Sequence, residues 1–156
     1  AGSRDLSQEE LLRLQQIVIE NPRFIETGYR KKGCFVGEHD RNTSEPMPDH
    51  ISAKHQDIEV LMNGLLNTEK LLLKSDMDAV LCATVLALGF VVIHPFEDGN
   101  GRTGRIINIL YLVEQGLLDI PVLFLSRYII ANKSDYYEGL RKSKHGNNGF
   151  YLCYAL

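Results

Sequence analysis

Hydrophobic and polar residues follow a helical period in two segments of the first half of the chain. Between Ser7 and Pro22 hydrophobic residues recur every three or four positions, and Ser7 with Glu10 has the pattern of a capping box. The segment that begins at Ile58 repeats this spacing as far as Leu66. We therefore expect one amphipathic helix that ends before Pro22, and a second over the later segment.

The segment Ala79–Ile93 differs because it is hydrophobic at almost every position. It is shorter than the roughly 20 residues that a membrane-spanning helix needs, so we expect a helix at the centre of the fold. Ser75 and Asp78 are expected to cap its start. Further helices are expected from about Asn100 to Glu114, over Pro121–Ile130, after Ser134, and from about Gly149.

The stretch between Phe24 and His50 has no helical period. Gly, Pro, Asn, Asp and Ser occupy much of it, and these residues favour turns. Its one short hydrophobic group is Cys34–Val36. We expect an exposed β-hairpin here, so the predicted fold class is mainly α with one small β-hairpin.

The composition is typical of a globular protein. The chain has 156 residues, of which 44% are hydrophobic and 24% charged, and its formal net charge is −3. Lys and Arg are scattered along the chain, so a nucleic-acid-binding surface is not indicated. We interpret residues 1–3 as a cloning scar, and residues 4–156 as a single domain cut from a longer protein.

The cysteines and the hydrophobic segments indicate where the protein works. Cys34, Cys82 and Cys153 are far apart and form no CxxC motif, so neither a disulfide framework nor a zinc site is expected. We recognise no signal peptide, and no segment long enough to span a membrane. These features predict a cytoplasmic protein that does not bind membranes.

The densest polar cluster of the chain is HPFEDGNGRTGR, residues 94–105, which lies between two hydrophobic segments. The segment Gly99–Gly101 stands where a loop is expected to become a helix, and backbone N–H groups at such a place bind anions. Arg102 and Arg105 share a face of the first helical turns, and their guanidinium groups suit the oxygens of a polyphosphate. The cluster therefore predicts a phosphate-binding site.

Two more residues of this cluster have side chains suited to group transfer. Asp98 offers a carboxylate of the kind that holds Mg²⁺ beside phosphates. His94 can accept a proton from a hydroxyl at neutral pH, because the unperturbed pKa of histidine is near 6.5. Neither GKS nor GKT follows the glycines, so the cluster is not a Walker loop.

Each of these residues also has an ordinary structural explanation. A His before Pro is more often structural, a lone Asp-Gly or Asn-Gly pair usually forms a turn, and an Arg on a first helical turn usually faces solvent. The concentration of all these residues in one loop, between two helices that are expected to be buried, favours the functional interpretation.

The cluster resembles the signature of the Fic domain family, HPFx(D/E)GNGRxxR, and every fixed position of that signature matches. The resemblance extends from GCFVGEHD to SRYIIANKSDYY, which covers most of the chain. It implies an all-α fold with a β-hairpin flap. It also implies transfer of AMP from ATP to a Ser, Thr or Tyr hydroxyl of a target protein, with release of pyrophosphate.

The resemblance implies a role for each residue of the loop. His94 would be the general base that deprotonates the target hydroxyl, and Phe96 would anchor the loop in the core. Asp98 would hold Mg²⁺ between the α- and β-phosphates. The phosphates would be bound by Gly99, Asn100 and Gly101, and their β/γ end by Arg102 and Arg105.

Two other segments acquire roles from the same resemblance. A flap would align the target segment by adding it as a β-strand. One of two tyrosines would line the adenine pocket, although two adjacent residues of a helix cannot face the same way. The flap residues are Cys34, Phe35, Val36 and Gly37, and the tyrosines are Tyr136 and Tyr137.

Other functions remain open. Some Fic relatives transfer phosphate or phosphocholine, but the phosphotransferase branch departs from the GNGR core that this chain keeps, so AMP transfer is favoured. An alternative of a different class is a nucleotide-binding regulatory or toxin–antitoxin module with little turnover. The expected cofactor is Mg²⁺, the substrate is ATP, and the partner is the hydroxyl of a target protein.

Many Fic proteins also carry an inhibitory helix in which Ser or Thr is followed four residues later by Glu and then by Gly or Asn. The string Ser134–Gly139 fits this pattern but lies in the helix expected to build the nucleotide pocket. The string Gln16–Asn21 fits only from Glu20 onward. We expect that an inhibitory segment is absent or lies outside this chain.

Overall fold

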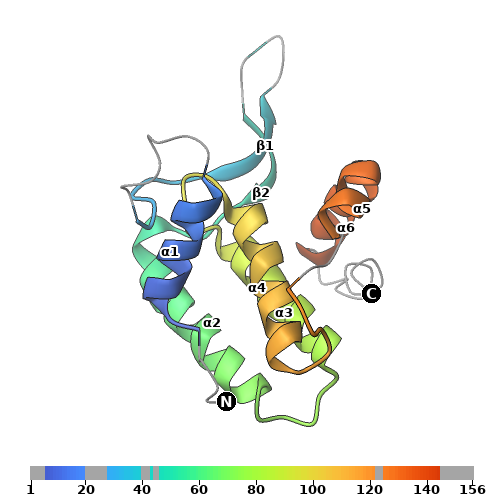
Figure 1. The fold of residues 1–156 in the computed structure, drawn as a ribbon. Coiled ribbons are helices and arrows are strands. Elements are labelled where there is room, and N and C mark those ends of the chain that lie inside the picture. The colour runs from blue at the N-terminus through green and yellow to red at the C-terminus, as the bar shows by residue number, and fades with distance from the viewer. Residues whose placement is uncertain (1–5, 20–27, 40–42, 44–45, 122–124, 145–156) are drawn as a thin grey trace. The chain divides into compact units, whose positions relative to one another are not determined.

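The computed structural model describes residues 6–19, 28–39, 43, 46–121 and 125–144. These residues are mainly helical and include one β-hairpin, so the predicted fold class is confirmed (Figure 1). The elements are α1 (Gln8–Val18), β1 (Phe35–His39), β2 (Pro46–Ile51), the 3-10 helix η2 (His55–Asp57), α2 (Ile58–Leu72), α3 (Ala79–Ile93), α4 (Asn100–Glu114), α5 (Leu125–Ala131) and α6 (Lys133–Lys144).

The chain forms two compact units. Unit 1 consists of residues 1–33 and 53–122 and contains α1 to α4. Unit 2 consists of residues 34–52 and 123–156 and contains the hairpin, α5 and α6. The loop that carries the signature therefore belongs to unit 1, and the hairpin belongs to unit 2. None of the described helices is both long and hydrophobic enough to cross a membrane.

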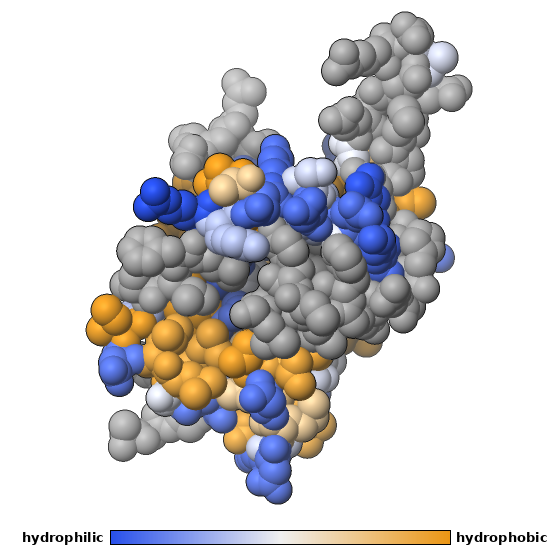
Figure 2. All heavy atoms as spheres, turned by 90° about the vertical axis from the view of Figure 1, so that its right-hand side faces the viewer, coloured by the Kyte–Doolittle hydropathy of each residue, from blue (hydrophilic) through white to orange (hydrophobic). Residues whose placement is uncertain are grey.

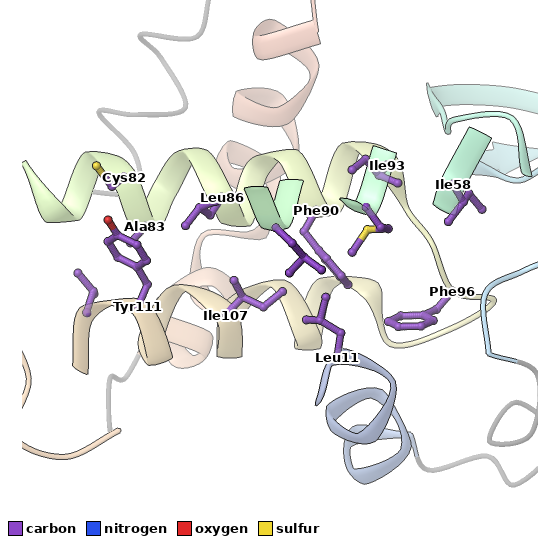
Figure 3. Packing of buried hydrophobic residues seen from close by; sticks show 13 residues of the cluster. Leu11, Ile58, Cys82, Ala83, Leu86, Phe90, Ile93, Phe96, Ile107 and Tyr111 are labelled. Atoms are coloured by element: carbon purple, nitrogen blue, oxygen red, sulfur yellow. The ribbon is translucent and has the colours of Figure 1, made fainter. Parts of the chain in front are cut away.

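The core of unit 1 lies between α3 and α4, with α1 and α2 packed beside them (Figure 3). Phe90 of α3 is fully buried, and Ile107 of α4 is 4% exposed. The two helices approach closely at Gly104, where an added Cβ would lie 3.0 Å from Cγ2 of Val91. This close approach explains why Gly104, at the last variable position of the signature, has no side chain.

The start of α1 agrees with the predicted capping box. The Ser7 hydroxyl accepts a hydrogen bond from the N–H of Glu10 at 3.2 Å, and the Glu10 carboxylate accepts one from the N–H of Ser7 at 2.8 Å. Gly116, with φ 70°, follows the end of α4, and its N–H donates to the carbonyl of Val113 at 3.0 Å. Pro22 lies outside the described residues.

The predicted cap of α3 is only half right. Asp78 is the N-cap, and its carboxylate accepts hydrogen bonds from two N–H groups in the first turn, at 2.9 Å and 3.1 Å. Ser75 instead donates to the carbonyl of Leu72, at the end of α2. Ser75 therefore closes the preceding helix, because its hydroxyl is too early in the chain to reach the first turn of α3.

The helix α3 is central in unit 1 but is not buried on every side. It packs against both α2 and α4. Val85 and Val92 are nevertheless 42% and 45% exposed. Figure 2 shows one face of the molecule on which hydrophobic side chains gather at the surface. A segment that is hydrophobic at almost every position thus still has an exposed face.

In unit 2, β1 and β2 pair in antiparallel fashion, with Phe35 opposite Ile51 and Val36 opposite His50. The register shifts between Val36 and Gly37, which indicates a β-bulge. The expected hairpin is therefore present: β1 includes Phe35, Val36 and Gly37, and Cys34 comes directly before it.

Two predicted helix starts after α4 are wrong. Pro121 is not helical, and the helix expected over Pro121–Ile130 is α5, which begins at Leu125. Ser134 is the second residue of α6 and not its cap, because the helix already begins at Lys133. The helix expected from Gly149 lies outside the described residues.

Candidate active site

The connection between α3 and α4 begins at His94, the C-terminal cap of α3. The backbone of His94 has φ 54° and ψ 60°, a left-handed conformation that costs a non-glycine residue about 1–3 kcal/mol. Its N–H donates to the carbonyl of Phe90 at 3.0 Å, and its ring Nδ1 lies 3.4 Å from the carbonyl oxygen of Val91. The surrounding structure must therefore stabilise this conformation.

Arg30 contributes to this stabilisation, although it lies 64 residues earlier in the chain. Its Nε donates to the carbonyl of His94 at 2.7 Å, and its Nη2 to the carbonyl of Ile93 at 3.4 Å. Its backbone N–H donates to the carbonyl of Pro95 at 2.9 Å. Carbonyls at a helix C-terminus lack helical partners, so the buried Arg30 supplies donors and a favourable positive charge there.

Phe96 fixes the middle of the loop. Its side chain is fully buried, and the ring centroids of Tyr29 and Phe90 lie 5.6 Å and 5.9 Å from its own. Asn100 closes the loop, since its Oδ1 accepts from the N–H of Phe96 at 2.9 Å and its Nδ2 donates to the carbonyl of Phe96 at 2.8 Å. Figure 3 shows Phe96 in the connection between the two helices, within the core.

Helix α4 starts within this loop. Gly99 is its N-cap with φ 84°, a left-handed conformation that glycine adopts without strain. The first hydrogen bond of the helix runs from the N–H of Thr103 to the carbonyl of Gly99 at 2.9 Å. The N–H groups before Thr103 thus face the loop, and together with the helix dipole they favour a bound anion.

Two arginines stand beside this helix start. Nη2 of Arg102 lies 3.2 Å from Oδ2 of Asp98, and these side chains are 34% and 42% exposed. Arg105 turns back toward the helix start, because a Cβ added to Gly101 would lie 3.5 Å from its Nη1. Both guanidinium groups therefore lie near the N–H groups that favour an anion.

Asp98 is the residue of this loop that fits a magnesium ligand. Its Oδ1 accepts from the N–H of Gly99 at 2.6 Å, and its Oδ2 faces Arg102, so both oxygens already have partners. Among the described residues there is no group of three or more His, Cys, Asp or Glu that could hold a metal ion. One carboxylate fits Mg²⁺, because this ion usually binds one or two carboxylates together with substrate phosphates and water.

The tyrosines that were predicted to line an adenine pocket lie on α6, in unit 2. Tyr136 is 8% exposed and Tyr137 is 38% exposed, and their rings meet edge to face with centroids 5.6 Å apart. The two side chains therefore face different ways, as expected for adjacent helical residues. Glu138 of the string Ser134–Gly139 pairs with Lys142 at 2.8 Å, and this hydrogen bond lowers the pKa of its carboxyl group.

Three features of the site were not foreseen from the sequence. Arg30 and Tyr29 contact the loop from a stretch that was interpreted as an exposed hairpin, with no role in holding the loop. Burial, and secondarily the charge of Glu59, raises the pKa of Tyr29 to about 12, so its hydroxyl stays neutral. Asn100 was assigned to phosphate binding through its backbone, whereas its side chain closes the loop.

Comparisons with known proteins give the same picture over most of the chain. A sequence profile of the Fic/DOC family matches residues 5–112. The protein adenylyltransferase Fic of Nematostella vectensis is 28% identical over 149 residues, which cover 93% of this chain and 30% of that protein. A protein of Aquifex aeolicus named "Probable protein adenylyltransferase" is 35% identical over 122 residues, which cover 78% of this chain and 32% of that protein.

The fold agrees as well. The crystal structure of a Fic family protein from Desulfovibrio desulfuricans superposes with a TM-score of 0.75 over 96% of this chain and 43% of that one, at 23% sequence identity. This chain spans just under a third of the length of the curated relatives described above. The family profile matches well over half of the chain, and the chain belongs to the Fic/DOC family.

Proposed function

We propose that this protein transfers AMP from Mg-ATP to a Ser, Thr or Tyr hydroxyl of a target protein. The single observation that carries the proposal is the loop between α3 and α4. It presents one His in a fixed backbone conformation, next to a helix start flanked by two arginines. The relatives named protein adenylyltransferases support the choice of AMP transfer.

His94 is the general base in this mechanism. If its Nδ1 carries the proton, that nitrogen can donate to the carbonyl of Val91, and Nε2 is left with a lone pair. Nε2 accepts the proton of the target hydroxyl as the hydroxyl oxygen attacks the α-phosphorus of ATP. A new O–P bond forms, the bond between the α-phosphorus and the bridging oxygen breaks, and pyrophosphate leaves with the bonding electron pair.

The start of α4 binds the phosphates. Backbone N–H groups of Gly99, Asn100 and Gly101, with Arg102 and Arg105, stabilise the negative charge that moves onto the leaving pyrophosphate. The N–H of Gly99 donates to the carboxylate of Asp98 in this structure, so its part requires that carboxylate to move. Asp98 would hold Mg²⁺, which would supply further positive charge to the phosphates. Arg102 now pairs with Asp98, so nucleotide binding requires this exposed ion pair to rearrange.

The hairpin is proposed to hold the target protein. Cys34, Phe35, Val36 and Gly37 would pair through their main chain with an extended segment that carries the hydroxyl. Main-chain pairing places a residue in register without requiring a particular side chain. Tyr136 or Tyr137 is proposed to contact the adenine.

Labelled ATP tests the proposed reaction. The purified protein is incubated with a cell lysate and Mg²⁺, once with ATP labelled at the α-phosphate and once with ATP labelled at the γ-phosphate. Label from the α-position on protein supports AMP transfer, and label from the γ-position alone shows phosphotransfer instead. No label in either sample, with ATP binding intact by calorimetry, shows a nucleotide-binding module.

A further inference from the structure

Arg30 lies outside the signature, yet its contacts converge on the proposed active site. We propose that Arg30 is a positioning residue, which fixes the backbone of His94 and joins it to the two residues of unit 1 that flank the hairpin segment. This inference rests on the proposed function. It concerns where the general base points, and not which groups bind the nucleotide.

The first set of contacts is at the end of α3. Arg30 supplies three hydrogen bonds to the consecutive carbonyls of Ile93, His94 and Pro95. The carbonyl of His94 points in its observed direction only because the residue is left-handed, and Nε of Arg30 binds it there. Loss of these bonds would let this backbone relax toward an ordinary conformation, and the imidazole would turn with it.

The second set of contacts is at the two points where the chain leaves unit 1 and returns to it. Nη1 of Arg30 donates to the carbonyl of Lys32 at 2.6 Å, just before the chain enters the hairpin. Nη2 donates to the carbonyl of Ala53, just after the chain returns. One guanidinium group therefore binds the carbonyls of Lys32 and Ala53, which flank the hairpin segment within unit 1, and the carbonyl of the residue proposed as general base.

The chemistry of this position calls for arginine. The four acceptors of the side chain are main-chain carbonyl oxygens, and they bind all three nitrogen atoms of the guanidinium group. A guanidinium group offers five donors in a rigid fork, whereas an ammonium group offers three donors at one atom. Arg30 is only 2% exposed, so water cannot replace donors that a substitution removes.

The test compares Arg30→Lys and Arg30→Met with the wild-type protein. The initial rate of AMP transfer, kcat and KM for the target, and the Kd of ATP are measured separately. We expect kcat to fall about 10²-fold, because small misplacements of a reacting group have effects of this size. The Kd of ATP should stay near the wild-type value, because Arg30 contacts none of the residues assigned to the phosphates.

Two matched variants control for charge and for stability. Lys31→Met removes an exposed positive charge from the next residue, and kcat should not change. Leu86→Ala weakens the core of unit 1 at a residue that is 2% exposed and lies away from the loop. It should lower the Tm without lowering the kcat of the folded protein.

Wild-type kcat in both Arg30 variants would overturn the inference. So would a parallel loss of ATP binding and kcat, because that result indicates a general structural role. If Arg30→Met does not fold, Arg30→Lys alone decides between these outcomes.

A readout independent of activity separates this inference from the proposed function. If the wild-type protein binds ATP but transfers no AMP, the proposed function fails. The backbone amides of His94 and Phe96 should still exchange hydrogen faster in Arg30→Lys than in Leu86→Ala. Equal exchange in these two variants would overturn the positioning role by itself.

Discussion

The loop between α3 and α4 and the β-hairpin differ in how their backbones are held. In the loop, polar groups from outside the segment hold the main chain. The distant Arg30 binds three successive carbonyls, two through its side chain and one through its backbone N–H, and Asn100, four residues on, binds both polar groups of Phe96. In the hairpin, the main chain of β1 pairs with β2, and β2 contains Pro46 and Pro48, which cannot donate.

The loop is also anchored by a more deeply buried side chain than the hairpin. Phe96 anchors the loop with a fully buried ring, whereas Ile51, which pairs with Phe35 in the hairpin, is 65% exposed. A group that moves a proton must be held within a fraction of an ångström, which requires such anchoring. A surface that accepts a strand from another protein gains from a backbone that can adjust. The difference therefore agrees with the proposal that the loop performs the chemistry and the hairpin binds the target.

The largest expected effect is at the residue with the most strained backbone. His94→Asn removes the proposed base but keeps a side chain that tolerates the left-handed conformation. We expect AMP transfer to fall about 10²-fold or more, with little change in the Kd of ATP. Labelled transfer and calorimetry measure the two quantities. Equal losses of binding and transfer would show that His94 is structural.

His94→Ala is the matched control for strain. Alanine lacks both the base and the tolerance of asparagine for the left-handed region, so this variant should lose about 1–2 kcal/mol of stability in addition. Thermal unfolding of the two variants therefore separates the chemical role of His94 from its backbone conformation.

The arginines proposed to bind phosphate should show the next effect. Arg102→Ala or Arg105→Ala should raise the Kd of ATP about 10- to 100-fold, as expected for a lost hydrogen bond between charged groups. The Kd of AMP, which lacks the β- and γ-phosphates, should rise much less. Lys74→Ala, an exposed cation of unit 1, is the control. Similar losses for ATP and AMP would contradict the assignment to the β/γ end.

The loop should also lose stability when its closing contacts are removed. Asn100→Ala leaves the buried N–H and carbonyl of Phe96 without their partner, which should lower the free energy of unfolding by about 1–3 kcal/mol. Asn67→Ala, at an exposed site on α2, should change it little. Denaturant unfolding measures both. If Asn100→Ala is as stable as the control, the loop is not held by this side chain.

The smallest effect is expected in the hairpin. The N–H of Ser52 donates to the carbonyl of Cys34, so the alternation of an antiparallel ladder directs the N–H of Phe35 away from β2. Phe35→Pro removes that donor, and target modification should fall about 2- to 12-fold, as for the loss of one hydrogen bond. The Kd of ATP should not change.

Phe35→Ala controls for the lost ring and should have the smaller effect on the target. Val36→Pro instead removes a donor that the same alternation directs toward β2, so it should disrupt the hairpin itself. Self-modification is scored apart from target modification in all three variants. If Phe35→Pro and Phe35→Ala modify the target at the same rate, the N–H of Phe35 does not pair with the target at the edge of β1 that faces away from β2.

The sequence determined those features that depend on neighbouring residues. The capping box of Ser7 and Glu10, the helix that ends at Ile93 and the helix start at Gly99–Asn100 follow from local patterns. The residues proposed for chemistry stand within residues 94–105, so their types and spacing could be interpreted together. Helix starts without such a local pattern, at Leu125 and Lys133, were misplaced.

Only the tertiary structure decided what holds the loop. Arg30 acts by binding main-chain oxygen atoms, and every residue offers similar atoms, so no residue pattern marks its partners. The left-handed backbone of His94 is likewise not encoded by its own preference. It persists because contacts formed 64 residues away stabilise a conformation that the local sequence alone would disfavour.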